Sequence, residues 1–290
     1  MIKSYINLLR PSHYIKNLIL FAPLIFSKHF YNLEDTFKIF LGFCLFSMAS
    51  SIVYVLNDIL DYNKDKVHPI KKSRPIACGE ISVRSAIILD ISLLVLLCTF
   101  CAFLGSLSFS IILAIYITTN VFYSSYLKQL VIIDVMFLAS FYVIRIVAGA
   151  FLINVDVSNW IVLCTFLGAL FLGFSKRRHE LTTLKGVAYE HRKVLVHYSP
   201  YFLDQLIAVV TASTVLSYAL YTVSEHTLKT LGTDKMFITV PFVIYGIFRY
   251  LYLVHKEKKG GNPTKLLIND IHIILTIVFW LTSTVIILLV

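Results

Sequence analysis

The stretch from Asn57 to Gly79 holds the residues best suited to chemistry, and it reads NDILDYNKDKVHPIKKSRPIACG. It follows a long apolar run and begins with three carboxylates, Asp58, Asp61 and Asp65. If the preceding helix continues through Asp65, their i, i+3, i+7 spacing places all three on one helical face. Carboxylates grouped in this way repel one another unless something binds them. The pattern therefore predicts a divalent cation at this face.

Basic residues follow these acids within the same stretch. They are Lys64, Lys66, Lys71, Lys72 and Arg74. A metal beside a basic loop suits a phosphorylated substrate, because both neutralise phosphate oxygens. The alternative is a solvated loop at a membrane surface, which we consider weaker because the three acids would then have no partner.

The composition predicts an all-α, polytopic membrane protein. The chain of 290 residues is 58% hydrophobic and only 14% charged, whereas soluble domains carry about 25% charged residues. Repeated apolar runs of about 20 residues predict nine transmembrane helices in one domain, residues 1–290. We place them near 14–30, 38–60, 82–104, 108–126, 130–152, 158–175, 203–224, 236–254 and 268–289.

The net charge of +10 follows from membrane topology and does not require nucleic acid as a partner. With nine spans, most of the 26 Lys and Arg residues fall in loops on one side of the bilayer. The positive-inside rule then places the N-terminus and the loops at about 57–81 and 176–202 in the cytoplasm. We therefore expect a plasma-membrane protein whose active site faces the cytoplasm.

The second long loop opens with Lys176, Arg177 and Glu180 and is mainly basic. Basic side chains at a helix end can clamp phosphate oxygens. The alternative is topological, since cytoplasmic helix ends are rich in Lys and Arg in any case.

Ionisable residues also occur within or just before predicted spans. Asp134 and Arg145 share a face of the fifth span but are separated by about 16 Å of rise, so we expect no direct ion pair. We expect Asp134 to lie near the cytoplasmic end of the span together with Lys128, and Arg145 to have another anionic partner. The alternative to a functional role is that these residues form structural buried pairs. Lys16 lies at the start of the first predicted span and could reach a phosphate or extend to lipid headgroups.

Several strings together resemble the UbiA-type intramembrane prenyltransferase superfamily, and most closely its decaprenyl-phosphate phosphoribosyltransferase branch. The first string is N-D-x-x-D-x-x-x-D-x-x-H-P-x-K-x-x-R-P-I-A-x-G at Asn57 to Gly79. The others are RPxxYxKN at 10–17, YSSYLKQLVIID at 123–134, SKRxxEL at 175–181 and GNPTKLLINDIH at 261–272. Typical aromatic prenyltransferases carry a second aspartate-rich motif after span six, where this chain has Lys176, Arg177 and Arg178.

The resemblance implies a UbiA-like helical bundle that transfers phosphoribose from phosphoribosyl pyrophosphate to a polyprenyl phosphate for cell-envelope polysaccharide synthesis. Asp58, Asp61 and Asp65 would hold Mg²⁺, or Mn²⁺, with Asn57 assisting. Lys71 and Arg74 would hold the ribose phosphate. The further residues expected to bind substrate are Lys16, Asn17, Tyr123, Lys128, Asp134, Arg145, Lys176, Arg177 and Glu180.

Two other functions fit parts of the sequence. A prenyltransferase that uses a prenyl diphosphate and an aromatic acceptor would share Asp58 and Asp61, although the basic second loop argues against it. A transporter would also carry intramembrane ionisable residues, but its site would lie near the midplane. Homo-oligomerisation is left open by the sequence.

Overall fold

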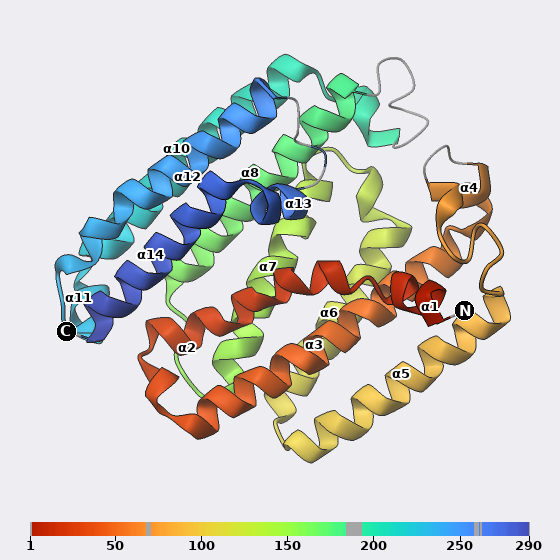
Figure 1. Cartoon of the computed structure of the whole chain (residues 1–290), viewed down its shortest axis with the longest axis horizontal. Coiled ribbons are helices and arrows are strands. Elements are labelled where there is room, and N and C mark those ends of the chain that lie inside the picture. The colour runs from red at the N-terminus through yellow and green to blue at the C-terminus, as the bar shows by residue number, and fades with distance from the viewer. Residues whose placement is uncertain (1, 68–70, 184–192, 258–260, 262, 290) are drawn as a thin grey trace. The chain divides into compact units, whose positions relative to one another are not determined.

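The computed structural model describes residues 2–67, 71–183, 193–257, 261 and 263–289, and the secondary structure in these ranges is helical (Figure 1). His68 and Pro69 of the first string, residues 184–192 of the second loop and Asn262 lie outside the described residues. The elements are α1 (Ile2–Leu9), η1 (Pro11–Phe21), α2 (Ala22–Phe26), η2 (His29–Tyr31), α3 (Leu33–Leu60), α4 (Tyr62–Val67), η3 (Lys71–Ser73), α5 (Val83–Leu104), α6 (Leu107–Ser125), η4 (Leu127–Gln129), α7 (Ile133–Leu152), α8 (Asn159–Thr183), η5 (Lys193–His197), α10 (Pro200–Val223), α11 (Glu225–Leu231), η6 (Lys235–Thr239), α12 (Val240–His255), α13 (Pro263–Asn269) and α14 (Ile271–Leu289).

Among the described residues, 8 helices are long and apolar enough to cross a membrane. They are α3, α5, α6, α7, α8, α10, the η6–α12 segment and α14. These helices match the second to ninth predicted spans, so the all-helical, polytopic prediction is confirmed. The count of nine spans and the orientation stay predictions.

The predicted first span, near 14–30, is not one long α-helix. Pro11 begins η1, a 3₁₀-helix of 11 residues, and α2 follows with Pro23 near its start. Eleven residues of 3₁₀-helix rise about 22 Å, so η1 alone is shorter than the roughly 30 Å hydrocarbon core, and α2 continues directly from it at Ala22. Proline favours such a start because its fixed φ and missing N–H are tolerated in a first helical turn.

The chain divides into two compact units, which we call the first and the second unit. The first unit comprises residues 1–22, 32–127 and 144–155, and the second comprises 23–31, 128–143 and 156–290. The prediction of a single domain over 1–290 stays a prediction.

The longest helix of the first unit, α3, is the element to which η1 attaches. Asn32 caps α3 by accepting hydrogen bonds from the backbone of Glu34 and Asp35, whose acids suit the helix N-terminus. Polar side chains of Arg10 and of η1 bind successive turns of α3, and the two segments run in opposite directions. The pairs are Arg10 with Asp58, His13 with Tyr54, Tyr14 with Ser51, and Asn17 with Ser47. We call this series the η1–α3 ladder, and it brings Arg10 to the carboxylate end of α3.

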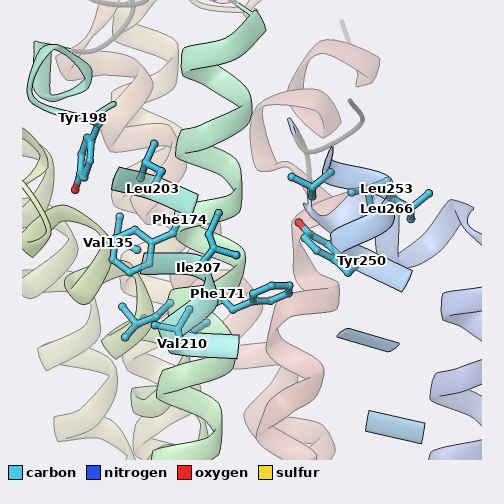
Figure 2. Packing of buried hydrophobic residues seen from close by; sticks show 14 of the residues in the cluster. Val135, Phe171, Phe174, Tyr198, Leu203, Ile207, Val210, Tyr250, Leu253 and Leu266 are labelled. Atoms are coloured by element: carbon cyan, nitrogen blue, oxygen red, sulfur yellow. The ribbon is translucent and has the colours of Figure 1, made fainter. Parts of the chain in front are cut away.

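In the second unit, α8, α10, α12 and α14 run side by side (Figure 1). Figure 2 shows the apolar packing beside these helices, where Phe174 of α8 lies among Val135 of α7 and Leu203 and Ile207 of α10. Tyr198, which directly follows η5, lies at the edge of this packing with its hydroxyl pointing away from Leu203 (Figure 2). The core therefore fixes Tyr198 beside the start of α7.

Gly149 of α7 lets η1 approach α7 closely within the first unit. A Cβ built on Gly149 would collide with the backbone carbonyl oxygen of Leu20 and lie 3.2 Å from its carbonyl carbon. Because the obstacle is backbone, it cannot be relieved by rotating a side chain.

We predict that Gly149→Ala lowers stability by about 1–3 kcal/mol, the usual cost of overpacking a closed core. Gly168→Ala in α8 is the matched control, because a Cβ there meets nothing within 4 Å. Thermal unfolding of the purified protein in detergent should show a lower melting temperature for Gly149→Ala and an equal or higher one for Gly168→Ala. Equal melting temperatures for the two variants would contradict the close approach of η1.

Candidate functional site

The three aspartates of the first string lie around a break between α3 and α4. Helix α3 ends at Leu60, and Asp61 has φ −91° and ψ 6° before α4 begins at Tyr62. The backbone bonds continue across the break, since Asp61 N donates to Asn57 O at 2.9 Å and Asp65 N donates to Asp61 O at 2.8 Å. The uninterrupted helix on which the one-face prediction depended is therefore not observed.

The break separates the trio. Asp58 and Asp65 are buried, whereas the Asp61 side chain is 23% exposed and lies 3.7 Å from the Lys64 ammonium. Within the described ranges, no three acidic, histidine or cysteine side chains gather closely enough to hold one metal ion. Asp61 thus stands apart from the other two predicted ligands.

Asp58 and Asp65 belong to a group with three basic side chains, which we call the acid–arginine cluster: Arg10, Asp58, Asp65, Lys71 and Arg74. Arg10 donates to Asp58 Oδ1 at 2.6 Å, and Arg74 donates to the same oxygen at 3.0 Å and to Asp65 Oδ2 at 2.5 Å. Lys71 Nζ lies 4.0 Å from Asp65 Oδ1. The structure therefore brings together four predicted site residues, Asp58, Asp65, Lys71 and Arg74, and it adds Arg10, which we had not assigned to the site. Their roles stay predictions.

Apolar anchors hold the backbone around this cluster. The chain after Arg74 is anchored by Ile76 and Ile81. Both side chains are buried in one apolar cluster with Leu8 of α1 and Val55 of α3. Arg10 itself has a left-handed backbone, with φ 54° and ψ 56°, and its guanidinium lies 4.9 Å from the centre of the Tyr54 ring. Arg10 and Arg74 thus reach the carboxylates from backbone segments that other contacts, namely the buried apolar residues and the Tyr54 ring, hold in place.

The second oxygen of Asp58 distinguishes the cluster from a closed ion pair. Oδ2 is buried and has no hydrogen-bond partner among the described residues, although Oδ1 accepts two guanidinium groups. A buried carboxylate oxygen without a partner is costly and points to a missing ligand. Mg²⁺ is commonly held by one or two carboxylates together with substrate phosphates. The residues present therefore fit a metal ion that binds together with a phosphorylated molecule.

A second polar group of the first unit surrounds Arg145, which is only 4% exposed. Its Nε donates to Asn17 Oδ1 at 2.7 Å, and its Nη2 donates to the Tyr116 hydroxyl at 3.1 Å. The guanidinium also lies 5.0 Å from the centres of the Phe46 and Tyr116 rings. Its contacts include an amide, a phenol and two aromatic rings, and the anionic partner that we expected stays a prediction. Arg145 thus supports the Asn17 end of the η1–α3 ladder.

The last turns of α8, where the sequence predicted the start of the second loop, contribute a buried ion pair in the second unit. Arg177 Nε donates to Asp134 Oδ2 at 2.8 Å, with side-chain exposures of 1% and 0%, and Arg177 Nη1 donates to Glu180 Oε2 at 3.0 Å. Lys176 Nζ lies 3.9 Å from Glu180 Oε1. This arrangement joins four predicted site residues, and it buries Arg177, which we had expected to clamp phosphate.

Tyr198 completes this second group and was not found from the sequence. Its hydroxyl donates to Asp134 Oδ1 at 3.2 Å and accepts from Ile132 N at 2.6 Å. Burial raises the pKa of Tyr198 to about 12, so the phenol keeps its proton as a donor near neutral pH. Ile132 has φ 66°, which is costly for a β-branched residue, and this hydrogen bond helps to hold it. No motif signals Tyr198, because it pairs with a residue 64 positions away.

The remaining predicted residues are placed by the structure as follows. Tyr123 is buried near the end of α6, Lys128 lies half-buried in η4, and Lys16 and Asn57 are half-buried in η1 and α3. Their predicted contacts with substrate stay predictions.

We predict that breaking the Asp134–Arg177 pair is expensive. Asp134→Leu leaves a buried guanidinium without its main partner and should cost about 3–5 kcal/mol of stability, with Arg177→Met costing a similar amount. The double variant should recover much of that loss, because no uncompensated charge remains. Unfolding in detergent measures all three variants, and Lys176→Met is the half-exposed control. Additive losses in the double variant would argue against direct coupling of the pair.

Comparison with known proteins places these features in one family. The model of the UbiA prenyltransferase family matches residues 19–267. The decaprenyl-phosphate phosphoribosyltransferase of Corynebacterium glutamicum is 29% identical over 271 residues, covering 91% of this chain and 80% of that protein. The enzyme of the same name from Mycobacterium tuberculosis is 26% identical over 291 residues, covering 98% and 93% respectively.

Solved structures with the same fold have lower sequence identity. A UbiA homologue from Archaeoglobus fulgidus, bound to GPP and Mg²⁺, superposes with a TM-score of 0.72 at 18% identity and covers 99% of this chain and 100% of its own. A structure described as digeranylgeranylglyceryl phosphate synthase gives a TM-score of 0.66 at 19% identity, with 98% of both chains covered. At these identities the likeness shows the fold alone. With its family match, its UbiA-like fold and its membrane-spanning helices, the chain is a multi-pass integral membrane protein that belongs to the UbiA prenyltransferase family.

Proposed function

We propose that this chain transfers the phosphoribosyl group of phosphoribosyl pyrophosphate to a polyprenyl phosphate and releases pyrophosphate. The observation that carries the proposal is the acid–arginine cluster, in which two buried carboxylates lie among three basic side chains and one carboxylate oxygen lacks a partner. The names of the relatives from Corynebacterium glutamicum and Mycobacterium tuberculosis support the same activity.

The cluster suits a donor that carries a diphosphate and a further phosphate. Asp58 and Asp65 would hold Mg²⁺, or Mn²⁺, against the diphosphate, with Asn57 assisting from the same turn of α3. Arg10, Lys71 and Arg74 supply more positive charge than the two acids need, so phosphate oxygens can complete the balance. Phosphoribosyl pyrophosphate has its third phosphate on the ribose, whereas a prenyl diphosphate has none.

The second loop favours the same donor over a prenyl diphosphate. A second acidic metal motif would need carboxylates available to an ion, but Glu180 and Asp134 both bind Arg177. Lys176, Arg177 and Arg178 stand where the second aspartate-rich motif of aromatic prenyltransferases would be. We therefore assign one metal-binding group of acids to this chain, in the first unit.

The chemical step is substitution at the anomeric carbon of ribose. An oxygen of the lipid phosphate forms a bond to C1, the bond from C1 to the pyrophosphate oxygen breaks, and the electron pair leaves with pyrophosphate. When bound, the metal ion stabilises the charge that develops on the leaving group. The lipid phosphate is already anionic near neutral pH, so the chain needs no general base to activate it.

Other residues take supporting roles in this proposal. Lys16, Lys128 and Lys176 neutralise phosphate groups, while Arg177 positions Asp134 and Glu180. Asn17 and Arg145 support the η1–α3 ladder that positions Arg10, and Tyr123 binds substrate. The reaction takes place on the cytoplasmic face of the plasma membrane and supplies precursors of cell-envelope polysaccharides.

Purified protein tests the proposal directly when it is incubated with phosphoribosyl pyrophosphate labelled in the ribose, with and without decaprenyl phosphate and Mg²⁺. We expect a labelled lipid that requires all three components. A labelled product formed from a prenyl diphosphate and an aromatic acceptor, with no labelled lipid from phosphoribosyl pyrophosphate, would establish the alternative prenyltransferase activity instead.

We predict that Asp58→Asn lowers transfer by about 100-fold or more, because the neutral amide loses the charge that holds the metal. The variant keeps the size of the side chain, so the protein should still fold and insert into membranes. Glu225→Gln is the matched control, since that side chain is 89% exposed in α11. Wild-type turnover by Asp58→Asn would remove Asp58 from the site.

A further inference from the structure

We propose that Arg10 and Arg74 act as exchangeable counter-cations, which neutralise Asp58 and Asp65 until a metal–diphosphate complex displaces them. The two arginines thereby exclude the free metal ion and then bind the phosphate oxygens of the complex that enters. This inference rests on the part of the proposed function that assigns a metal–diphosphate to the acid–arginine cluster.

The charge of the site supports this exchange. Asp58, Asp61 and Asp65 contribute three negative charges, whereas Arg10, Lys64, Lys71 and Arg74 lie at ion-pair distance from them and contribute four positive charges. A hydrated divalent cation therefore meets a site with no excess of negative charge. The same cation bound to a diphosphate has a net negative charge, which the arginines attract.

The hydrogen bonds of Asp58 favour an exchange in which its side chain does not move far. Both guanidinium groups bind Oδ1 of Asp58, while Oδ2 is buried and has no hydrogen-bond partner among the described residues. A ligand that binds Oδ2 satisfies this oxygen at once. The guanidinium groups that are released have a planar array of donors, which suits the oxygens of a diphosphate.

The Asp134–Arg177 pair, which we interpret as a permanent structural ion pair, differs from the acid–arginine cluster in the solvent exposure of its cation. In the Asp134–Arg177 pair both side chains are sealed, with exposures of 0% and 1%. In the acid–arginine cluster the acids are sealed, but Arg10 is 21% exposed and Arg74 is 25% exposed. The arginines are thus the accessible members of the cluster, as an exchange with an entering ligand requires.

Segments on either side of the acids present the two arginines independently. Arg10 lies between α1 and η1, where the left-handed backbone and Pro11 set the direction of the chain, and the η1–α3 ladder fixes its distance from Asp58. Arg74 follows η3, and its backbone is bonded to Lys71 and Cys78. Each arginine can therefore be replaced without removing the segment that holds the other.

The test measures Mn²⁺ binding by electron paramagnetic resonance on the full-length protein in nanodiscs of neutral lipid, with and without inorganic pyrophosphate. The variants are Arg10→Met and Arg74→Met, because methionine removes the charge without adding an oxygen ligand. Arg84→Met is the matched control, since Arg84 is an exposed cation at the start of α5. Arg10→Lys keeps the charge and should behave like the wild type toward free Mn²⁺.

We expect the wild type to bind Mn²⁺ weakly alone and much more tightly with pyrophosphate. Each Arg→Met variant should bind free Mn²⁺ about tenfold more tightly or better, and pyrophosphate should help it less. A gain that Arg10→Lys and Arg84→Met do not share comes from the loss of positive charge at the cluster. Tight binding of free Mn²⁺ by the wild type, or no gain in either Arg→Met variant, would overturn the inference.

This result is separate from the identity of the donor. Inorganic pyrophosphate is common to a phosphoribosyl and a prenyl diphosphate donor, so the binding test can succeed even if labelled phosphoribosyl pyrophosphate gives no lipid product. Conversely, phosphoribosyl transfer with no gain in Mn²⁺ affinity would support the proposed function and reject the exchange.

Discussion

The buried Asp58 carboxylate is the constraint on which the arrangement of the first unit depends. An ionised group that is only 2% exposed must be neutralised, and two guanidinium groups share one of its oxygens to do so. Because Arg10 and Arg74 come from segments on opposite sides of Asp58 in the sequence, both segments must be held close to the end of α3. Several otherwise unrelated features of the unit meet that requirement.

The η1–α3 ladder is the clearest of these features. A long apolar α-helix would have crossed the bilayer with few polar side chains, whereas η1 uses His13, Tyr14 and Asn17 to follow α3 residue by residue. Arg145 binds the far end of the ladder through Asn17, and Gly149 provides the room that η1 needs beside α7. The need to position Arg10 thus accounts for Pro11, Gly149 and the buried Arg145, each of which would be unfavourable in a membrane protein without this role.

Sequence reasoning was most reliable where a strong physical signal repeats. Apolar length located the eight long helices. The acids and bases from Asn57 to Gly79 indicated a charged group, of which the structure gathers Asp58, Asp65, Lys71 and Arg74, whereas Asp61 lies beside Lys64. The first predicted span consists of η1 followed by α2, and hydropathy could not predict this because it does not register side-chain bonds to a neighbouring helix. Pairings between distant residues, such as Tyr198 with Asp134, leave no local pattern and could be found only in the fold.

Buried carboxylates are neutralised differently in the two units. In the second unit, Arg177 and Asp134 form a sealed pair supported by Tyr198, which suits a fixed framework. In the first unit the acids are sealed but their cations remain accessible, which suits a site that changes partners. This difference leads to the central claim, that Asp58 exchanges arginine for a metal–diphosphate during binding.

A crystal structure with Mn²⁺ and phosphoribosyl pyrophosphate bound tests this claim most directly, because the anomalous signal of manganese locates the ion without ambiguity. We predict the ion at coordination distance from Asp58 and from diphosphate oxygens, with the Arg10 guanidinium moved onto a phosphate. An ion located away from Asp58, with Arg10 and Arg74 still sharing Oδ1, would contradict it.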